Sequence, residues 1–223
     1  KVTERLTEII HPATQAQIAH FHNLGLRERI LNLPVMVALV LSMVWRQIGE
    51  VTTLVKTLRD EGLLWATPRR VSQQAVSQRL RTFPAILFLR ILQTVLPQMH
   101  TRWQERQRPL PPEIAWAQAR YTEVMVHDGS TLDALLRKVG LLREAETNPL
   151  AGRMTALLDL CSRLPRHIWY EEDAQAHDQR FWPRILETLQ AGSLLIFDLG
   201  YTNFKVYAQL TAATITFITR CLL

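Results

Sequence analysis

The chain has 223 residues, 48% of them hydrophobic and 21% charged, a balance typical of a folded globular protein. The longest apolar run, Leu33–Trp45, is shorter than the about 20 residues that cross a bilayer, so no membrane attachment is expected. The two cysteines lie far apart in no metal-ligand spacing, which excludes a disulfide-dense secreted scaffold and indicates a reduced protein of the cytoplasm.

Positive charge is concentrated in the first half of the chain. Residues 1–120 carry 16 Lys and Arg against 8 Asp and Glu, whereas residues 121–223 carry 10 against 12. The excess is densest from Ala66 to Arg108, where eight arginines accompany a single acid, Glu105. A basic, arginine-rich front half suits a polyanion such as DNA, and a solvated charged surface is the alternative.

Residues 13–105 are predicted to be helical because their apolar residues recur at helical spacing. The segment 108–112 contains three prolines and is a stiff break. We therefore predict an all-helical DNA-binding domain over residues 1–110 and a second domain over residues 111–223. Within the first domain the helices are expected at Val35–Ile48, Val51–Leu64, Ser72–Leu80 and Phe83–Met99.

The helix expected at Ser72–Leu80 resembles the recognition helix of a DNA-binding protein. Ser72 can cap it, and Ala75, Val76 and Leu80 can face inward. Together with the preceding helix and the turn at Gly62, the pattern indicates a helix-turn-helix, with an ordinary helical bundle as the alternative. The side chains expected to contact base edges or phosphates are Gln73, Gln74, Gln78, Arg79 and Arg81.

The hydrophobic pattern of the second domain predicts three strands, a helix, a strand, a helix and a final strand. Three strands can form a meander, and the later helix–strand units then add parallel strands. This order is similar to that of a ribonuclease H-like α/β domain, with a mixed sheet whose first three strands are antiparallel. The strands are expected at Tyr121–His127, Arg153–Leu160, Pro165–Tyr170, Ser193–Phe197 and Ala213–Thr219, and the helices at His177–Gln190 and Tyr201–Leu210.

Two aspartates end predicted apolar strands. Asp128 precedes Gly129, and Asp198 precedes a turn that contains Gly200. In the predicted topology these strands are neighbours, so both carboxylates would converge at the strand ends where α/β sheets bind ligands. Mg²⁺ accepts a few carboxylates, waters and phosphate oxygens, and two such ions support phosphodiester chemistry. The alternative is that each aspartate only caps the turn that follows it.

At these aspartates the sequence resembles the DDE transposases of the insertion-sequence-four family. Residues 126–132, Val-His-Asp-Gly-Ser-Thr-Leu, are similar to the first acidic motif, and residues 195–204, Leu-Ile-Phe-Asp-Leu-Gly-Tyr-Thr-Asn-Phe, are similar to the second. The segments 157–160, 176–178 and 217–220 fit intervening positions of the family. The resemblance covers about residues 120–223.

The resemblance implies an enzyme that cuts and joins DNA at the ends of its own mobile element. Asp128 and Asp198 would hold Mg²⁺ or Mn²⁺, and water and then a DNA 3′ hydroxyl would be the nucleophiles. The partners would be double-stranded element ends and target DNA, bound by a homodimer associated with the nucleoid. Tyr201 would lie near DNA, or would be a half-buried aromatic residue at the start of a helix.

The sequence departs from the family in two places. Leu199 occupies a position where Arg is common, and the third motif, which supplies a catalytic Glu, does not occur before Leu223. We therefore expect residues 1–223 to bind DNA without cutting it, unless Asp159 or Asp178 completes the site. The rival interpretations are a non-catalytic DNA-binding fragment of a decayed transposase and a metal-dependent nuclease that does not join strands.

Overall fold

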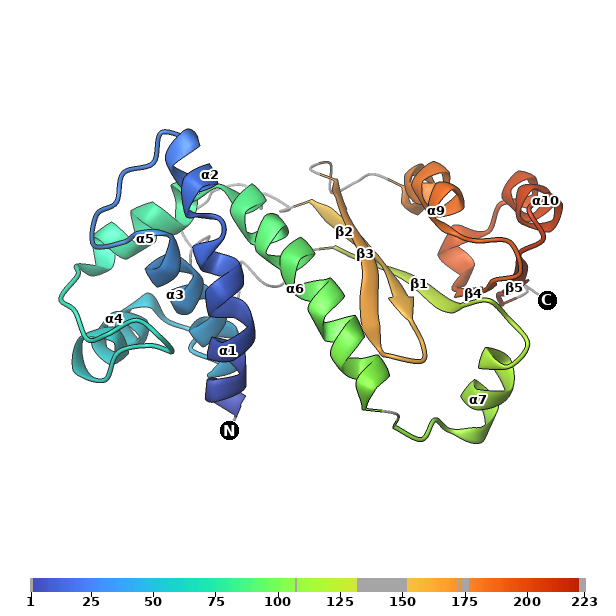
Figure 1. The fold of residues 1–223 in the computed structure, drawn as a ribbon. Helices are drawn as coiled ribbons and strands as arrows, with labels where there is room; N and C mark the ends of the chain where they lie inside the picture. The colour runs from blue at the N-terminus through green and yellow to red at the C-terminus, as the bar shows by residue number, and fades with distance from the viewer. Residues whose placement is uncertain (1, 107, 132–151, 172, 174–176, 221–223) are drawn as a thin grey trace. The chain divides into compact units, whose positions relative to one another are not determined.

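The computed structural model describes residues 2–106, 108–131, 152–171, 173 and 177–220 (Figure 1). Leu132 and Ala176, which belong to two of the segments compared above, lie outside these residues. The described chain forms two compact units, one ending at Gln98 and the other starting at Met99. This division lies within helix α6 (Ala85–Glu105), directly after Pro97, whereas the sequence placed the boundary at residue 110. Proline lacks the N–H of a helical hydrogen bond and so weakens the helix there.

The first unit is helical, as the apolar periodicity predicts. Helix α3 buries most of its side chains and begins where Asn32 accepts a hydrogen bond from the Val35 N–H at 3.2 Å. Pro34 follows in the first turn, where the missing N–H costs nothing. The helices of this unit that precede α6 are α1 (Val2–Gln15), α2 (Ile18–Asn23), α3 (Leu33–Trp45), α4 (Val51–Asp60) and α5 (Gln73–Thr82).

The connection between α4 and α5 is longer than the sequence indicated. Helix α4 ends at Asp60 rather than at Leu64, because Gly62 takes a φ of +78° and Leu63 pairs with Ala66 in an isolated bridge. Residues 61–72 therefore separate the two helices, whereas a helix-turn-helix uses a turn of about three or four residues. The pair of helices is present, but the tight turn between them is not.

The second unit contains a five-stranded mixed sheet in the order β3-β2-β1-β4-β5. Strands β1 to β3 form an antiparallel meander, and β4 and β5 add to β1 in parallel. The predicted mixed α/β class with three antiparallel strands first is confirmed. The strands are β1 (Val124–Thr131), β2 (Arg153–Asp159), β3 (Leu164–Glu171), β4 (Leu194–Phe197) and β5 (Thr216–Ile218).

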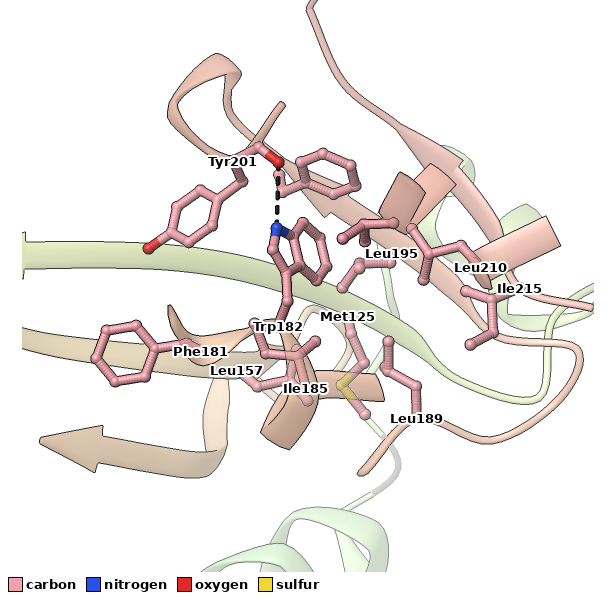
Figure 2. Packing of buried hydrophobic residues seen from close by; sticks show 12 residues of the cluster. Met125, Leu157, Phe181, Trp182, Ile185, Leu189, Leu195, Tyr201, Leu210 and Ile215 are labelled. Atoms are coloured by element: carbon pink, nitrogen blue, oxygen red, sulfur yellow. Dashed lines mark hydrogen bonds between the residues drawn. The ribbon is translucent and has the colours of Figure 1, made fainter. Parts of the chain in front are cut away.

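Each face of this sheet carries its own apolar cluster. On one face Met125, Leu195 and Phe197 pack with helices α9 (Trp182–Thr188) and α10 (Phe204–Ala212), which Figure 1 shows side by side above the strands. Figure 2 shows the side chains of this cluster, with Trp182 at its centre. On the other face Val124 and Leu194 pack with helix α7 (Pro112–Gln118) and neighbouring apolar residues. This separation follows from the alternation of side chains along a strand.

The helices of the second unit are shorter than predicted. The single helix expected at His177–Gln190 is a 3₁₀ turn, η1 (Asp178–Phe181), followed by α9, because Pro183 is tolerated only in a first helical turn. The helix expected at Tyr201–Leu210 is likewise divided into η2 (Leu199–Tyr201) and α10.

No single helix in the described part of the chain is long and apolar enough to cross a membrane. Helices α5 and α6 pass that test only when taken together, on length and composition, and they are bent by 74°.

Candidate active site at the ends of two parallel strands

Asp128 and Asp198 lie at equivalent positions on two adjacent strands. Strands β1 and β4 pair in parallel from Val124↔Leu194 to His127↔Phe197, and the two aspartates are the next residue on each strand. Neighbouring strands lie about 4.8 Å apart, so the backbones of the two aspartates are close although 70 positions separate them in the sequence. The sequence-based prediction that their strands are neighbours is confirmed.

The two carboxylates belong to the same face of the sheet. Along β1 and β4, His127 and Phe197 point to the face covered by α9 and α10, where both contact the Trp182 ring. The backbone at Asp198 is still extended, with a φ of −86° and a ψ of 176°, so the alternation continues through it. Asp128 and Asp198 therefore take the opposite face, and both residues are exposed to solvent.

Each carboxylate uses one oxygen to accept a hydrogen bond from a backbone N–H that follows it in the sequence. Asp128 Oδ1 accepts a hydrogen bond from the Gly129 N–H, and Asp198 Oδ1 accepts one from the Gly200 N–H, both at 2.8 Å. Within the described chain the second oxygen, Oδ2, makes no hydrogen bond or ion pair in either residue. Asp198 thus caps the turn that follows it, as considered from the sequence, whereas Asp128 and Gly129 lie within β1, which continues to Thr131 instead of ending at His127. One oxygen of each carboxylate is left available.

A network of buried polar side chains contacts the backbone of Asp128. The Thr155 hydroxyl, on β2, donates to the Asp128 carbonyl oxygen at 2.9 Å and lies 3.3 Å from the Tyr201 hydroxyl. The His127 ring packs edge-on against the Tyr201 ring with centroids 4.1 Å apart. His127 is therefore a core residue. Thr155 was not anticipated, because its role depends on a strand pairing that no local motif reveals.

Tyr201 is part of this core and not of the surface. Its side chain is 2% exposed, and its carbonyl oxygen accepts a hydrogen bond from the Trp182 indole at 3.2 Å (Figure 2). A ring enclosed in this way offers no surface to a nucleic acid. The expectation that Tyr201 contacts DNA is corrected accordingly, and the alternative, an aromatic residue packed at the start of a helix, describes it.

Asp159 does not reach the aspartate pair. It lies beside Met125, three positions back along β1 from Asp128, which corresponds to about 10 Å of strand. Its carboxylate accepts hydrogen bonds from the Cys161 N–H at 2.9 Å and the Ser162 hydroxyl at 2.8 Å. Asp159 therefore stabilises the turn between β2 and β3.

The strand on the far side of β4 brings a cation toward the pair. Strand β5 pairs in parallel with β4 up to Ile196↔Ile218, and the Thr219 hydroxyl donates to the Asp198 carbonyl oxygen at 3.4 Å. Arg220 follows directly and is exposed. An exposed arginine that follows the strand next to Asp198 can contact a phosphate, a role the sequence did not suggest for this residue.

The donor set suits a hard divalent cation but is small. Two carboxylate oxygens on adjacent strands are typical ligands of Mg²⁺, which fills its remaining positions with water and phosphate oxygens. Among the described residues, no three His, Cys, Asp or Glu side chains gather closely enough to hold a metal ion. Residues Asp128 and Asp198 therefore fit part of a metal site.

The residues predicted to contact DNA lie on α5, in the other unit. Gln73, Gln74, Gln78 and Arg81 are exposed and line a polar hollow of about 570 Å³. Arg79 is half-buried, with its guanidinium 5.3 Å from the centre of the Phe83 ring. The inward face is narrower than expected: Val76 is buried and Leu80 half-buried, but Ala75 is exposed.

The fold and the two carboxylates that follow the parallel pairing of β1 and β4 define a mixed α/β protein with a candidate cation site. No known family model, no curated protein and no solved structure matches the chain.

Proposed function

We propose that the chain belongs to a transposase that binds the ends of a mobile DNA element and cuts and joins DNA strands with the help of Mg²⁺ or Mn²⁺. The observation that supports this most directly is the parallel pairing of β1 and β4, which ends immediately before Asp128 and Asp198. Family resemblance pointed to the same two residues through motifs that are far apart in the sequence. Two independent lines of reasoning therefore converge on one pair of carboxylates.

The sheet topology supports a ribonuclease H-like fold for the catalytic unit. An antiparallel meander followed by two parallel strands, in the order β3-β2-β1-β4-β5, agrees with the arrangement expected from the strand and helix order. The separate basic helical unit supports DNA binding, because residues 1–98 carry 12 Lys and Arg against 6 Asp and Glu. A homodimer acting on paired ends remains part of the proposal.

In this proposal Asp128 and Asp198 would hold the cation with the carboxylate oxygens that make no hydrogen bond among the described residues, while the glycine N–H groups keep both carboxylates oriented. A bound divalent ion supplies a Lewis acid that activates the attacking oxygen and stabilises the leaving one. Arg220 would contact a phosphate of the DNA, and Thr155 would hold the backbone of Asp128 in place. These groups orient the reacting phosphodiester, which accounts for a large part of such catalysis.

Substitution by asparagine separates the capping role of each aspartate from metal binding. In Asp128→Asn and Asp198→Asn the amide oxygen can still accept the glycine N–H, but the negative charge is lost. We expect both variants to fold normally and bind DNA, yet to lose metal-dependent cleavage by at least a factor of about 100, the scale of losing a well-placed electrostatic group. Cleavage is measured with the complete product of the reading frame.

Metal binding itself is measured with the 223-residue chain by Fe²⁺-directed hydroxyl-radical cleavage of the backbone. The wild-type chain should be cut near residues 128 and 198, and the asparagine variants should not. Asp159→Asn is the matched control, because this carboxylate lies on the same sheet but serves the β2–β3 turn. If either asparagine variant cleaves DNA within a few-fold of wild type, the assignment of the two carboxylates is wrong.

A non-catalytic DNA-binding protein is the second candidate. The observation that favours it is that each aspartate already has a local structural role, because Asp198 caps η2 and Asp128 accepts the Gly129 N–H within β1. In that case the wild-type chain would bind duplex DNA, and iron-directed backbone cleavage at residues 128 and 198 would be absent.

A further inference from the structure

The helical unit contains a pocket whose charged lining residues, among those that the structure describes, are all arginines. It lies between α5 and the segment that joins α2 to α3, and its volume is about 680 Å³. The polar and charged side chains that could contact a ligand in it are Arg27, Arg29, Arg70, Arg79, Ser72 and Gln78.

No carboxylate in the described part of the chain forms an ion pair with any of these four arginines. Glu28 lies between two of them in sequence, but its carboxylate is 3.7 Å from His22 and does not line the pocket. No acid occurs from Gly62 to Gln98 either. Four like charges around one concavity repel each other, and an anion bound among them would relieve that repulsion.

Arg79 is held rigidly at the wall of the pocket. Its guanidinium lies over the rings of Phe21 and Phe83, at 5.8 and 5.3 Å from their centres. Its Nε is buried and has no hydrogen-bond partner among the described residues, and burial lowers the pKa of this arginine. A guanidinium fixed by stacking loses little entropy when it binds an anion.

Two further features favour an anion at this position. The N-terminus of α5 opens on the pocket, with Ser72 as its cap and no acidic residue in its first turn, so the helix dipole adds positive potential. The loop is also braced, because Arg69 Nη1 donates to the Ile30 carbonyl oxygen at 3.4 Å. Arg69 thus stabilises the loop, whereas within the described part of the chain no side-chain hydrogen bond or ion pair is formed by the four pocket arginines.

We infer that this pocket binds a phosphate group through Arg27, Arg29, Arg70 and Arg79. The guanidinium fork matches phosphate oxygens in pairs, which makes arginine the usual residue for this task. The identity of the ligand rests on the proposed function: the phosphate belongs to the backbone of a DNA duplex that lies along α5. The neighbouring polar hollow, which shares Gln78 and Thr82 with the pocket, would then face the base edges.

The test compares Arg29→Gln and Arg70→Gln with Arg59→Gln in the full chain. Arg59 is an exposed arginine of the same unit, paired with Asp60 at 2.7 Å and outside the pocket. Fluorescence anisotropy with a short duplex is measured across a salt series. Each pocket variant should weaken binding roughly tenfold, as expected when a hydrogen bond to a charged group is lost. Each should also reduce the slope of log affinity against log salt concentration by about one, while Arg59→Gln changes neither.

A second arm uses inorganic pyrophosphate, measured by isothermal titration calorimetry, to separate DNA from a free phosphate compound. If the pocket variants lose pyrophosphate binding but keep wild-type DNA affinity, the phosphate site stands and its ligand is a small molecule. If both affinities match those of Arg59→Gln, the inference is overturned. Thermal unfolding of each variant shows that the fold is retained, and Arg79 is left unchanged because of its packing role.

Failure of this inference is distinguishable from failure of the proposed function. Asp128→Asn leaves the pocket intact, so DNA and pyrophosphate binding should persist when cleavage is lost. If the pocket variants keep wild-type affinity for DNA and pyrophosphate and the protein still shows metal-dependent cleavage, only the pocket is rejected, because Asp128 and Asp198 would still act. Pyrophosphate binding that depends on Arg29 and Arg70, in a protein that never cuts DNA, would reject the enzyme alone.

Discussion

At the scale of single residues, the candidate site shows one side chain serving two roles. Asp128 and Asp198 each commit one oxygen to a glycine N–H and leave the other available. The local hydrogen bond restricts the carboxylate to one orientation before any ligand arrives. Because the carboxylate is already oriented, less entropy is lost when a ligand binds. The same side chain thus contributes to the local structure with one oxygen and to the candidate site with the other.

The buried network beneath Asp128 leads to a prediction about Tyr201. Tyr201→Phe removes a hydroxyl that lies 3.3 Å from Thr155 Oγ1, so the free energy of unfolding should fall by about 1 kcal/mol. DNA affinity should stay at the wild-type value, because the ring is 2% exposed. Denaturant unfolding and anisotropy measure the two quantities. A large loss of DNA affinity with unchanged stability would restore the DNA-contact role.

Thr155→Val should act differently from Tyr201→Phe, because the threonine hydroxyl also holds the Asp128 carbonyl oxygen. We expect it to reduce metal-dependent cleavage as well as stability, since even small displacements of a reacting group cost rate. Thr155→Ser keeps the hydroxyl and should retain most of the activity. Equal activity in the valine and serine variants would show that this hydrogen bond does not position the carboxylate.

Sequence reasoning predicted that the strands of Asp128 and Asp198 are neighbours, but it ended the first strand at His127, whereas β1 continues to Thr131. It did not find Thr155 or the surroundings of Arg79, because these depend on residues that are remote in the sequence. Phe21 lies on α2 and contacts Arg79 on α5, and Thr155 reaches Asp128 only through the register of β2. Nothing in the local periodicity encodes such contacts.

At the scale of elements, the positions of helices and strands follow from hydrophobic spacing, and their ends depend on single residues. Helix α4 stops early because of Gly62, and α9 starts late because of Pro183. Apolar positions at helical spacing up to Leu63 suggested a longer helix, but a glycine with a positive φ and a bridge from Leu63 to Ala66 end it. A local turn therefore ended a helix whose apolar spacing continued in the sequence.

Two glycines of the helical unit test this explanation. Gly62 and Gly25 have φ values of +78° and +72°, but a Cβ at Gly62 would lie 2.5 Å from the Ala66 carbonyl oxygen, whereas one at Gly25 would meet nothing within 4 Å. Gly62→Ala should therefore cost about 2–3 kcal/mol, and Gly25→Ala about 1 kcal/mol, the cost of the backbone conformation alone. Thermal unfolding measures both, and equal losses would contradict the steric argument.

At the scale of the whole molecule, the excess positive charge and the candidate metal ligands lie in different units. Residues 1–98 carry the entire excess of positive charge, since residues 99–223 contain 14 Lys and Arg and 14 Asp and Glu. The candidate metal ligands lie in the neutral part, where DNA is not attracted by net charge. Affinity and catalysis would therefore be supplied by separate parts of the chain, and each can be altered with little effect on the other.

This separation predicts that residues 1–110 alone bind duplex DNA. The fragment keeps α6 whole, although the division between the units lies within that helix. Its affinity should fall steeply and linearly with the logarithm of salt concentration, because phosphate contacts release counterions. Circular dichroism establishes that the fragment is helical, and anisotropy gives its affinity. Binding that is absent at low salt, or insensitive to salt, would argue against the basic unit as the DNA-binding part.

The order of the strands also affects whether the sheet can pair with a strand of another molecule. Strands β3 and β5 are the two edges of the described sheet, and an open edge can recruit a strand from another chain. On β3, Pro165 lacks a donor, Arg166 is exposed and charged, and the register shifts opposite Leu157 and Leu158. On the other edge, β5 is only three residues long. Both edges are therefore poor templates for intermolecular strand addition, and aggregation through this sheet is disfavoured.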